Sequence, residues 1–151
     1  MPKILLINGP NLNMLGTRQP EIYGYDTLAD VEARVAKRAQ PHGFEVDARQ
    51  SNHEGDIVTF IQDAVKEKMA GIIINPAAYT HTSLAIVDAL LQYGGPKIEL
   101  HLSNPHTRDA IRHKSMVSPV VTATIAGLGP YGYELAVDAM VELIKKGAAK
   151  K

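Results

Sequence analysis

The segment KIELHLS (97–103) carries polar residues at every second position. In a strand, this alternation places Glu99, His101 and Ser103 on one face and the aliphatic residues between them on the other. Residues two apart along a strand are about 6.5–7 Å apart, so a glutamate and a histidine side chain can meet. A carboxylate can orient an imidazole and keep it protonated near neutral pH, as a general acid requires. The same spacing also suits a structural hydrogen bond that fills a polar spot, and the pattern alone does not choose between the two.

A long polar loop, GPNLNMLGTRQPEIYG (9–24), separates an apolar run from the next helical pattern. Strand-to-helix loops usually span about two to six residues, so a loop of this length indicates a lid, a binding loop or disorder. Arg18 and Tyr23 lie on either side of Pro20 in this loop. A tyrosine acts as a base near pH 7 only if its pKa falls by about 3 from its usual value of about 10, which takes about 4 kcal/mol. A neighbouring guanidinium favours the phenolate and can supply much of that free energy. The alternative is a tyrosine that packs on the surface of a mobile loop.

A third polar segment, NPAAYTHTS (75–83), follows another apolar run. Asn75 stands at the predicted strand end, and His81 lies in the loop beyond it, either as a binding residue or as a partly exposed loop histidine. The hydroxyl residues at the end of this segment suit the start of a helix. Asp88 is the one charge in the helical segment SLAIVDALLQ. Because an unpaired buried carboxylate is costly, Asp88 either faces a polar site or pairs across a subunit boundary.

Strand and helix patterns alternate along the chain and predict how these residues are positioned. Apolar, β-rich runs predict strands at 3–8, 44–49, 71–75, 97–102 and 120–127, and stripes with a period near 3.6 predict helices at 27–40, 56–69, 82–93 and 132–146. Thr27, with Asp30 three residues on, is expected to cap the first helix, and Gly43 to help end it. Such alternation predicts an α/β fold, a three-layer sandwich in which a five-stranded parallel sheet has helices on both faces. We expect the flavodoxin-like strand order 2-1-3-4-5, in which ligands bind beyond the carboxyl ends of the strands.

The composition limits the classes of function. The chain has 151 residues, of which 45% are apolar and 21% are charged, and its formal net charge is zero. We expect one domain over 1–151, with a folded core at 1–146 and a frayed tail at 147–151. Zero net charge offers no long-range attraction for nucleic acid or an anionic membrane, and no apolar run reaches the roughly 18 residues of a membrane span. The lack of cysteine excludes disulfides, thiolate metal sites and cysteine nucleophiles, and it favours a cytoplasmic location.

Four segments, in order and at matching spacing, resemble type II 3-dehydroquinate dehydratases: INGPNLNMLGTRQPEIYG, NPAAYTHTS, IELHLSNPHTRDAIRHKS and IAGLGPYGYELA. As a set they are specific, and the resemblance covers almost the whole chain. Gln19 stands where the family often has Glu, and SNPHTRD varies within a tolerant stretch; neither difference touches a residue with an expected role. The resemblance implies a flavodoxin-like hydro-lyase that removes water from 3-dehydroquinate to give 3-dehydroshikimate. It also implies that the enzyme has no cofactor and assembles as a homododecamer, a tetramer of trimers.

The resemblance also implies a role for each site residue. Tyr23 would be the base, held as tyrosinate by Arg18, and Asn11 would stabilise the resulting enolate by positioning a water. His101 would protonate the departing hydroxyl while Glu99 orients His101. The residues expected to hold the substrate are Asn75, His81, the backbone near Leu102, Ser103 and Arg112, with Asp88 reaching a neighbouring subunit's site and Arg108 in a supporting role.

Three other classes of function fit the motifs less well. A flavin- or nucleotide-binding module of the same fold needs a phosphate-cradling loop after the first strand, and GPNLNMLG has neither the G-x-G-x-x-G nor the P-loop pattern. A receiver-like signalling domain needs acids at the strand ends, where this chain has asparagines. A metal site is weakly indicated, because His101, His106 and His113 form no i,i+4 pair on a helix. The sequence leaves open whether the enzyme makes aromatic precursors or degrades quinate.

Overall fold

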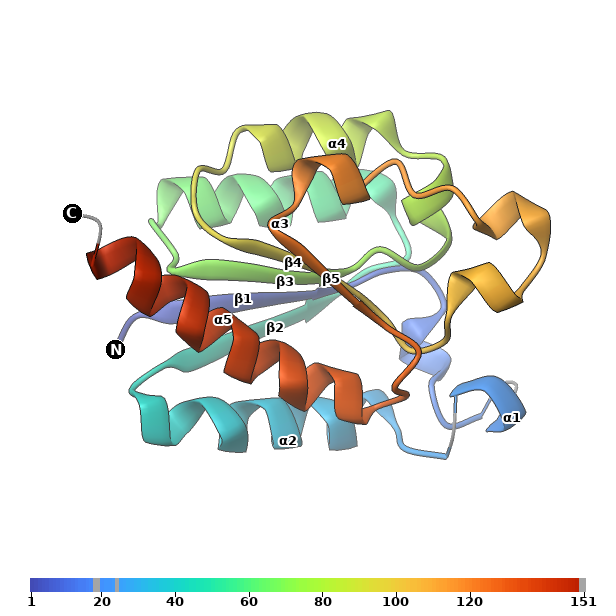
Figure 1. The fold of residues 1–151 in the computed structure, drawn as a ribbon, viewed down its shortest axis with the longest axis horizontal. Coiled ribbons are helices and arrows are strands. Elements are labelled where there is room, and N and C mark those ends of the chain that lie inside the picture. The colour runs from blue at the N-terminus through green and yellow to red at the C-terminus, as the bar shows by residue number, and fades with distance from the viewer. Residues whose placement is uncertain (18–19, 24, 150–151) are drawn as a thin grey trace.

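The strands form one parallel sheet. The computed structural model describes residues 1–17, 20–23 and 25–149. Within these ranges the strands are β1 (Lys3–Asn8), β2 (Glu45–Gln50), β3 (Gly71–Asn75), β4 (Lys97–His101) and β5 (Ala123–Ala126). They lie in the order β2-β1-β3-β4-β5 and all of their pairings are parallel, as Figure 1 shows. The strand order predicted from the sequence is therefore confirmed.

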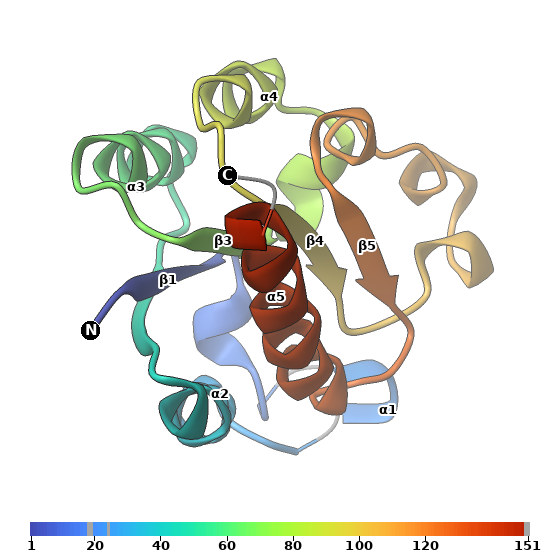
Figure 2. The same ribbon diagram turned by 60° about the vertical axis from the view of Figure 1, so that its left-hand side comes forward.

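Helices cover both faces of this sheet. Their bounds are Pro20–Tyr23 (α1), Leu28–Ala39 (α2), Glu54–Lys66 (α3), Leu84–Leu91 (α4) and Tyr131–Ala149 (α5). In Figures 1 and 2, α2 and α5 lie on one face and α3 and α4 on the other, which is the predicted three-layer sandwich. Short 3-10 turns lie at Leu12–Met14, Gln40–His42, Ala77–His81, Pro105–Thr107, Ala110–Arg112 and Ser118–Val120. Among the described residues, no helix is long and apolar enough to cross a membrane.

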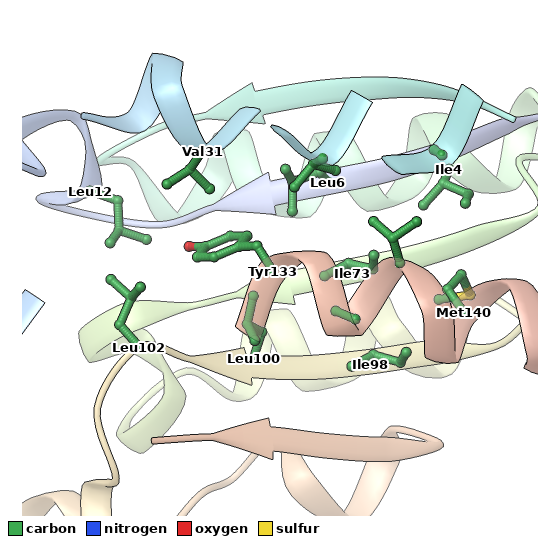
Figure 3. Packing of buried hydrophobic residues seen from close by; sticks show 14 of the residues in the cluster. Ile4, Leu6, Leu12, Val31, Ile73, Ile98, Leu100, Leu102, Tyr133 and Met140 are labelled. Carbon is green, nitrogen blue, oxygen red and sulfur yellow. The ribbon is translucent and has the colours of Figure 1, made fainter. Parts of the chain in front are cut away.

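Successive residues of the central strands fill cores on opposite faces. Ile4 and Leu6 of β1 and Ile73 of β3 pack beneath α2 and α5, around Tyr133 and Met140 (Figure 3). The opposite core lies beneath α3 and α4 and includes Leu5, Ile7, Ile57, Ile61, Ile72, Ile74, Ile86 and Leu90. Burying one such side chain is worth about 1.5–3 kcal/mol. Because both faces of β1 and β3 are covered, these strands are apolar at consecutive positions rather than at alternate ones.

The start of α2 has the predicted cap. Thr27 Oγ1 accepts a hydrogen bond from the Asp30 backbone N–H at 3.2 Å, and Asp30 Oδ2 accepts one from the Thr27 N–H at 3.0 Å. This reciprocal pair satisfies two amides that the helix leaves without a carbonyl partner. Beyond α2 a 3-10 turn continues to Gly43, which adopts φ 85° and closes it. Only glycine adopts that conformation without strain, so the chain turns into β2 at this point.

Four elements differ from their predicted bounds by two or more residues at one or both ends. β5 begins at Ala123 rather than 120 because its partner β4 begins at Lys97, and 118–120 form a 3-10 turn instead. α4 begins only at Leu84 because the Ser83 side chain caps it, accepting from the Ile86 N–H at 3.0 Å. α3 covers Glu54–Lys66 instead of 56–69, and Lys68 just beyond it has φ 53°, which no α-helix continues. α5 continues to Ala149, so the boundary predicted at 146 falls inside a helix.

Candidate active site

Polar residues from three strand ends meet at one edge of the sheet. The Gly9 N–H donates to the Asn75 carbonyl at 2.8 Å, so the chain leaves β1 and β3 side by side. A Cβ at position 9 would lie 2.6 Å from the Pro76 carbonyl oxygen, and this close approach requires glycine. His101 ends β4, the neighbouring strand. A cavity of about 110 Å³ opens at this edge, where a parallel sheet of this order is expected to bind its ligand.

The cavity brings together seven of the eleven predicted site residues. They are Asn11, Asn75, His81, His101, Leu102, Ser103 and Arg112. Arg108 lines the cavity as well, so two arginines contribute to its wall. The described residues around it include no Asp or Glu. The cavity is therefore polar and cationic, and it suits a small hydroxylated molecule that carries a carboxylate.

His101 and Glu99 form the predicted pair. His101 Nε2 lies 2.5 Å from Glu99 Oε2, and the two residues are 8% and 1% exposed. Because this bond occupies Nε2, the other ring nitrogen, Nδ1, is left for the cavity that His101 lines. Ile98 and Leu100 face the hydrophobic core beneath α5, as the alternation predicted. This geometry holds an imidazole in one orientation at the cavity wall.

Three hydroxyl groups surround the Glu99 carboxylate besides the imidazole, two of them at close hydrogen-bond distance. Ser118 Oγ donates to Oε1 at 2.5 Å, Ser115 Oγ donates to Oε2 at 2.8 Å, and Thr124 Oγ1 lies 3.5 Å from Oε1. Burial by itself raises the pKa of Glu99, but hydrogen bonds from His101, Ser118 and Ser115 and the attraction of the imidazolium outweigh it and bring the pKa below its ordinary value. Glu99 is therefore a carboxylate at neutral pH. A smaller cavity of about 60 Å³ lies next to it.

The Asn75 side chain is held by a hydrogen bond to Tyr133, a residue of α5. The buried Tyr133 hydroxyl donates to Asn8 Oδ1 at 2.6 Å and accepts from Asn75 Nδ2 at 3.0 Å. Asn75 Oδ1 accepts from the Ala77 N–H at 3.1 Å. Burial raises the pKa of Tyr133 well above its ordinary value, so its hydroxyl stays neutral and can donate. In Figure 3 the Tyr133 ring lies among aliphatic side chains with its oxygen toward the loop end of the sheet.

Arg112 lies in the turn Ala110–Arg112 and lines both cavities. Its Nε is buried and has no hydrogen-bond partner within the described part of the chain. An unpaired buried donor is costly, and a bound anion would remove that cost. His81 is fixed differently, because its Nδ1 lies 2.7 Å from the Lys114 carbonyl oxygen.

A family model described as dehydroquinase class II matches residues 2–141 of the chain. The chain belongs to this family. It is 51% identical over 148 residues to a protein named 3-dehydroquinate dehydratase 2 from Pseudomonas putida, covering 98% of this chain and 99% of the relative. It is 56% identical over 144 residues to a 3-dehydroquinate dehydratase from Cereibacter sphaeroides, covering 95% of this chain and 97% of the relative.

Solved structures of type II dehydroquinases have the same fold. The one from Butyrivibrio crossotus superposes with a TM-score of 0.90 at 44% identity and covers 92% of this chain and 97% of its own. A 3-dehydroquinate dehydratase-like protein from Bifidobacterium longum superposes with a TM-score of 0.73 at 33% identity, covering 96% of this chain and 99% of its own.

Of the other four predicted site residues of this class II dehydroquinase, Glu99 lines the smaller cavity beside His101. Arg18 and the side chain of Tyr23 lie outside the described residues. Asp88 is exposed on α4 and lines neither of the two cavities around Glu99 and His101. Asp88 was predicted either to face a polar site or to pair across a subunit boundary. The described residues of its own chain offer it no such site, and pairing across a subunit boundary stays a prediction.

The loop after β2 holds Asn11 in place beside the cavity, a role that the sequence analysis did not predict. Asn52 Oδ1 accepts from the Asn11 N–H at 2.9 Å and from Gln50 Nε2 at 3.2 Å. Asn11 itself has φ 70°, a left-handed conformation that this contact helps to hold. Tyr79 Oη donates to the Asn52 carbonyl at 2.8 Å, which joins the loops after β2 and β3. The polar run after β2, adjacent to β1 in the predicted order, was the signal that could have indicated it.

The described residues offer no metal site. They contain no group of three or more His, Cys, Asp or Glu side chains placed to hold a metal ion. His106 and His113 do approach each other, with ring centroids 6.0 Å apart, but His113 Nε2 lies 2.7 Å from the Arg108 carbonyl oxygen. These two histidines therefore form part of the loop structure beside the cavity.

Proposed function

We propose that the chain is a type II hydro-lyase that removes water from 3-dehydroquinate to give 3-dehydroshikimate in the shikimate pathway. Family membership and the names of its relatives support this activity. The observation that carries the proposal is His101, backed by the buried carboxylate of Glu99, at the wall of a cationic cavity. Such a pair is suited to protonate a leaving hydroxyl.

The reaction begins with the loss of a proton from the carbon next to the ketone. In our proposal Tyr23, as a tyrosinate near Arg18, takes that proton, and the C–H electrons move to the ketone oxygen to form an enolate. Asn11 lines the cavity and would position a water that stabilises the enolate. A neutral tyrosine is too weak a base for this step, so the role of Arg18 is to lower the pKa of Tyr23.

Elimination then completes the reaction. The enolate collapses, the new C=C bond forms, and the C–O bond to the leaving hydroxyl breaks while His101 supplies a proton. Water and 3-dehydroshikimate are the products, and a proton must pass from Tyr23 to His101 to restore the enzyme. The base and the acid are separate groups in this proposal, so they can act on opposite faces of the substrate, as an anti elimination requires.

The remaining cavity residues hold the substrate in this proposal. Arg112 is the carboxylate partner, because its planar guanidinium matches two oxygens and its buried Nε has no other described partner. The substrate hydroxyls would be held by Asn75, His81, Ser103 and the backbone near Leu102, all of which line the cavity.

The activity can be tested directly by spectroscopy. The product contains an enone conjugated to a carboxylate and absorbs in the ultraviolet, whereas the substrate does not contain that system. Adding 3-dehydroquinate to the purified chain should give an absorbance rise that depends on protein concentration. Its absence, with the fold intact by circular dichroism, would rule out the proposed function.

We propose further that residues 1–151 form a single catalytic domain, that the enzyme is cytoplasmic, and that it assembles as a homododecamer of four trimers. The support for assembly lies on α4, where Leu84 and Leu91 are 62% and 63% exposed on either side of Asp88. Residues spaced in this way share one face of a helix. An apolar face with one carboxylate is suited to contact another subunit.

A further inference from the structure

The proposed general acid depends on a carboxylate that is itself buried. Glu99 is 1% exposed and lies 2.5 Å from His101 Nε2 through Oε2 only. If the carboxylate rotates, Oε2 leaves the imidazole, and His101 loses the orientation that the proposed reaction requires. The atoms that hold Oε1 therefore determine how well His101 is positioned.

Within the described part of the chain, only one close contact holds Oε1. Ser118 Oγ donates to it at 2.5 Å, while Thr124 Oγ1 is 3.5 Å away, which is long for a hydrogen bond between oxygens. Ser115 Oγ donates a hydrogen bond to the other oxygen, Oε2. It also accepts hydrogen bonds from the backbone N–H groups of Val117 at 3.2 Å and Ser118 at 3.0 Å. Ser115 thus has a structural role in its own turn, whereas the one described contact of the Ser118 hydroxyl is Glu99.

We propose that Ser118 is a positioning residue for the dehydration, because its hydroxyl fixes Glu99 Oε1 and so keeps Oε2 on His101. This inference rests on the proposed function. Ser118 begins a 3-10 turn at the surface, on an element separate from the strand that carries Glu99 and His101. Ser118 is an exposed residue and belongs to neither hydrophobic core, so removing its hydroxyl creates no cavity there.

The same contact also favours the charged form of Glu99. The hydrogen bond from Ser118 is one of the contacts that lower the pKa of Glu99 against the effect of burial. Thr124 from β5 and Ser115 reach the carboxylate as well, and the titratable or charged side chains that face the adjoining cavity are His81, His101, His106, Arg112 and His113. None of these side chains is a carboxylate. Glu99 is therefore the carboxyl group of this cluster whose pKa should rise when the Ser118 hydroxyl is removed.

The experiment is a double-mutant cycle on steady-state turnover of 3-dehydroquinate. It compares Ser118→Ala, Glu99→Gln and the double variant with the wild-type chain. If Ser118 acts through Glu99, Ser118→Ala should lower kcat about tenfold in the wild-type background, with KM changed less than about twofold. In the Glu99→Gln background the same change should lower kcat less than about twofold, because partners in one network are not additive.

Two further variants separate the hydroxyl from general structural damage. Ser118→Thr keeps a donor at the same position and should restore kcat to within about threefold of wild type. Ser51→Ala removes a different serine–carboxylate bond, from Ser51 Oγ to Asp56 Oδ2 at 2.6 Å. Its effect on kcat should be the same factor in both backgrounds, since Ser51 has no contact with Glu99 among the described hydrogen bonds.

The pH dependence provides a readout that a purely structural role would not affect. The deficit of Ser118→Ala relative to wild type should grow as pH falls from about 8 to about 5, because its Glu99 protonates at higher pH. Equal factors for Ser118→Ala in both backgrounds, or a deficit independent of pH, would overturn the inference. A wild-type chain without dehydratase activity would overturn the proposed function and the inference with it, whereas an active wild type with additive variants would overturn the inference alone.

Discussion

Glu99 is the one carboxylate among the described residues that contacts the proposed general acid, and its charge also contributes to stability. Its pKa in the folded chain is lower than the ordinary value of 4.5, so its contribution to the free energy of unfolding is present above that pH and is lost as pH falls through the folded-state pKa. Glu99→Gln should therefore unfold at lower urea concentration than wild type at pH 7. The difference should narrow as the pH is lowered below about 4.5. Urea titrations of both proteins at several pH values measure it, and a gap that widens on acidification would contradict the assignment.

The roles of the other site residues separate in steady-state kinetics. His101→Ala and Tyr23→Phe should each lower kcat by about 10²–10⁴-fold, the usual range for loss of a general acid or base. Arg112→Ala should mainly weaken binding, because it removes the partner of the substrate carboxylate. Initial-rate measurements over a range of substrate concentrations give kcat and KM for each. Near wild-type turnover in Tyr23→Phe would show that the base is another residue.

Lysine chemistry is not expected at this site. No lysine lines the cavity among the described residues, and Lys97 is engaged at the opposite end of β4, where its Nζ donates to the carbonyls of Leu90 and Tyr93. Borohydride added together with 3-dehydroquinate should leave activity intact, because it traps an imine and not an enolate. Mass spectrometry of the treated protein provides the check. Substrate mass attached to a lysine, with irreversible loss of activity, would contradict the enolate mechanism.

At the scale of elements, one tyrosine of α5 joins the ends of β1 and β3. Tyr133→Phe removes both hydroxyl contacts and leaves the Asn8 and Asn75 side chains without those partners. The free energy of unfolding should fall by about 1–3 kcal/mol, and KM should rise because Asn75 is no longer held. Urea denaturation and kinetics measure the two effects.

Tyr93→Phe is the matched control for that substitution. The Tyr93 hydroxyl is also buried and donates to the Met69 carbonyl at 2.6 Å, but it is not part of the cavity. Its loss should cost a similar free energy of unfolding and leave KM unchanged. Equal changes in KM for the two variants would mean that Tyr133 has no specific influence on Asn75.

At the scale of the whole molecule, the exposed face of α4 predicts assembly. Asp88→Ala should loosen the oligomer and weaken substrate binding in the adjoining subunit, because one side chain would serve both the interface and the site. Sedimentation velocity and a binding titration on the same preparation test the two effects together. A fully active wild-type monomer, or an Asp88→Ala protein unchanged in both measurements, would rule out a shared site.

Local patterns in the sequence were sufficient for the elements and for contacts within one element. Continuous apolar runs indicated β1 and β3 because both faces of those strands are buried. The Thr27–Asp30 capping box and the Glu99–His101 pair were predicted because their partners are two or three residues apart, a separation at which backbone geometry alone sets the distance. Element ends were less accurate, since a strand such as β5 ends where its partner does.

Tertiary structure decided which distant side chains complete the site. Ser118 lies 19 residues from Glu99, Asn52 lies 41 residues from Asn11, and Tyr133 lies 125 residues from Asn8. No periodicity links such positions, because their contacts depend on how strands pair and how helices pack across the sheet. The sequence by itself therefore determined the alternating elements, the strand-end residues and the Glu99–His101 pair. Only the folded chain determined what holds those residues in place, because a hydrogen bond requires its partners within about 3 Å and packing alone brings separate elements that close.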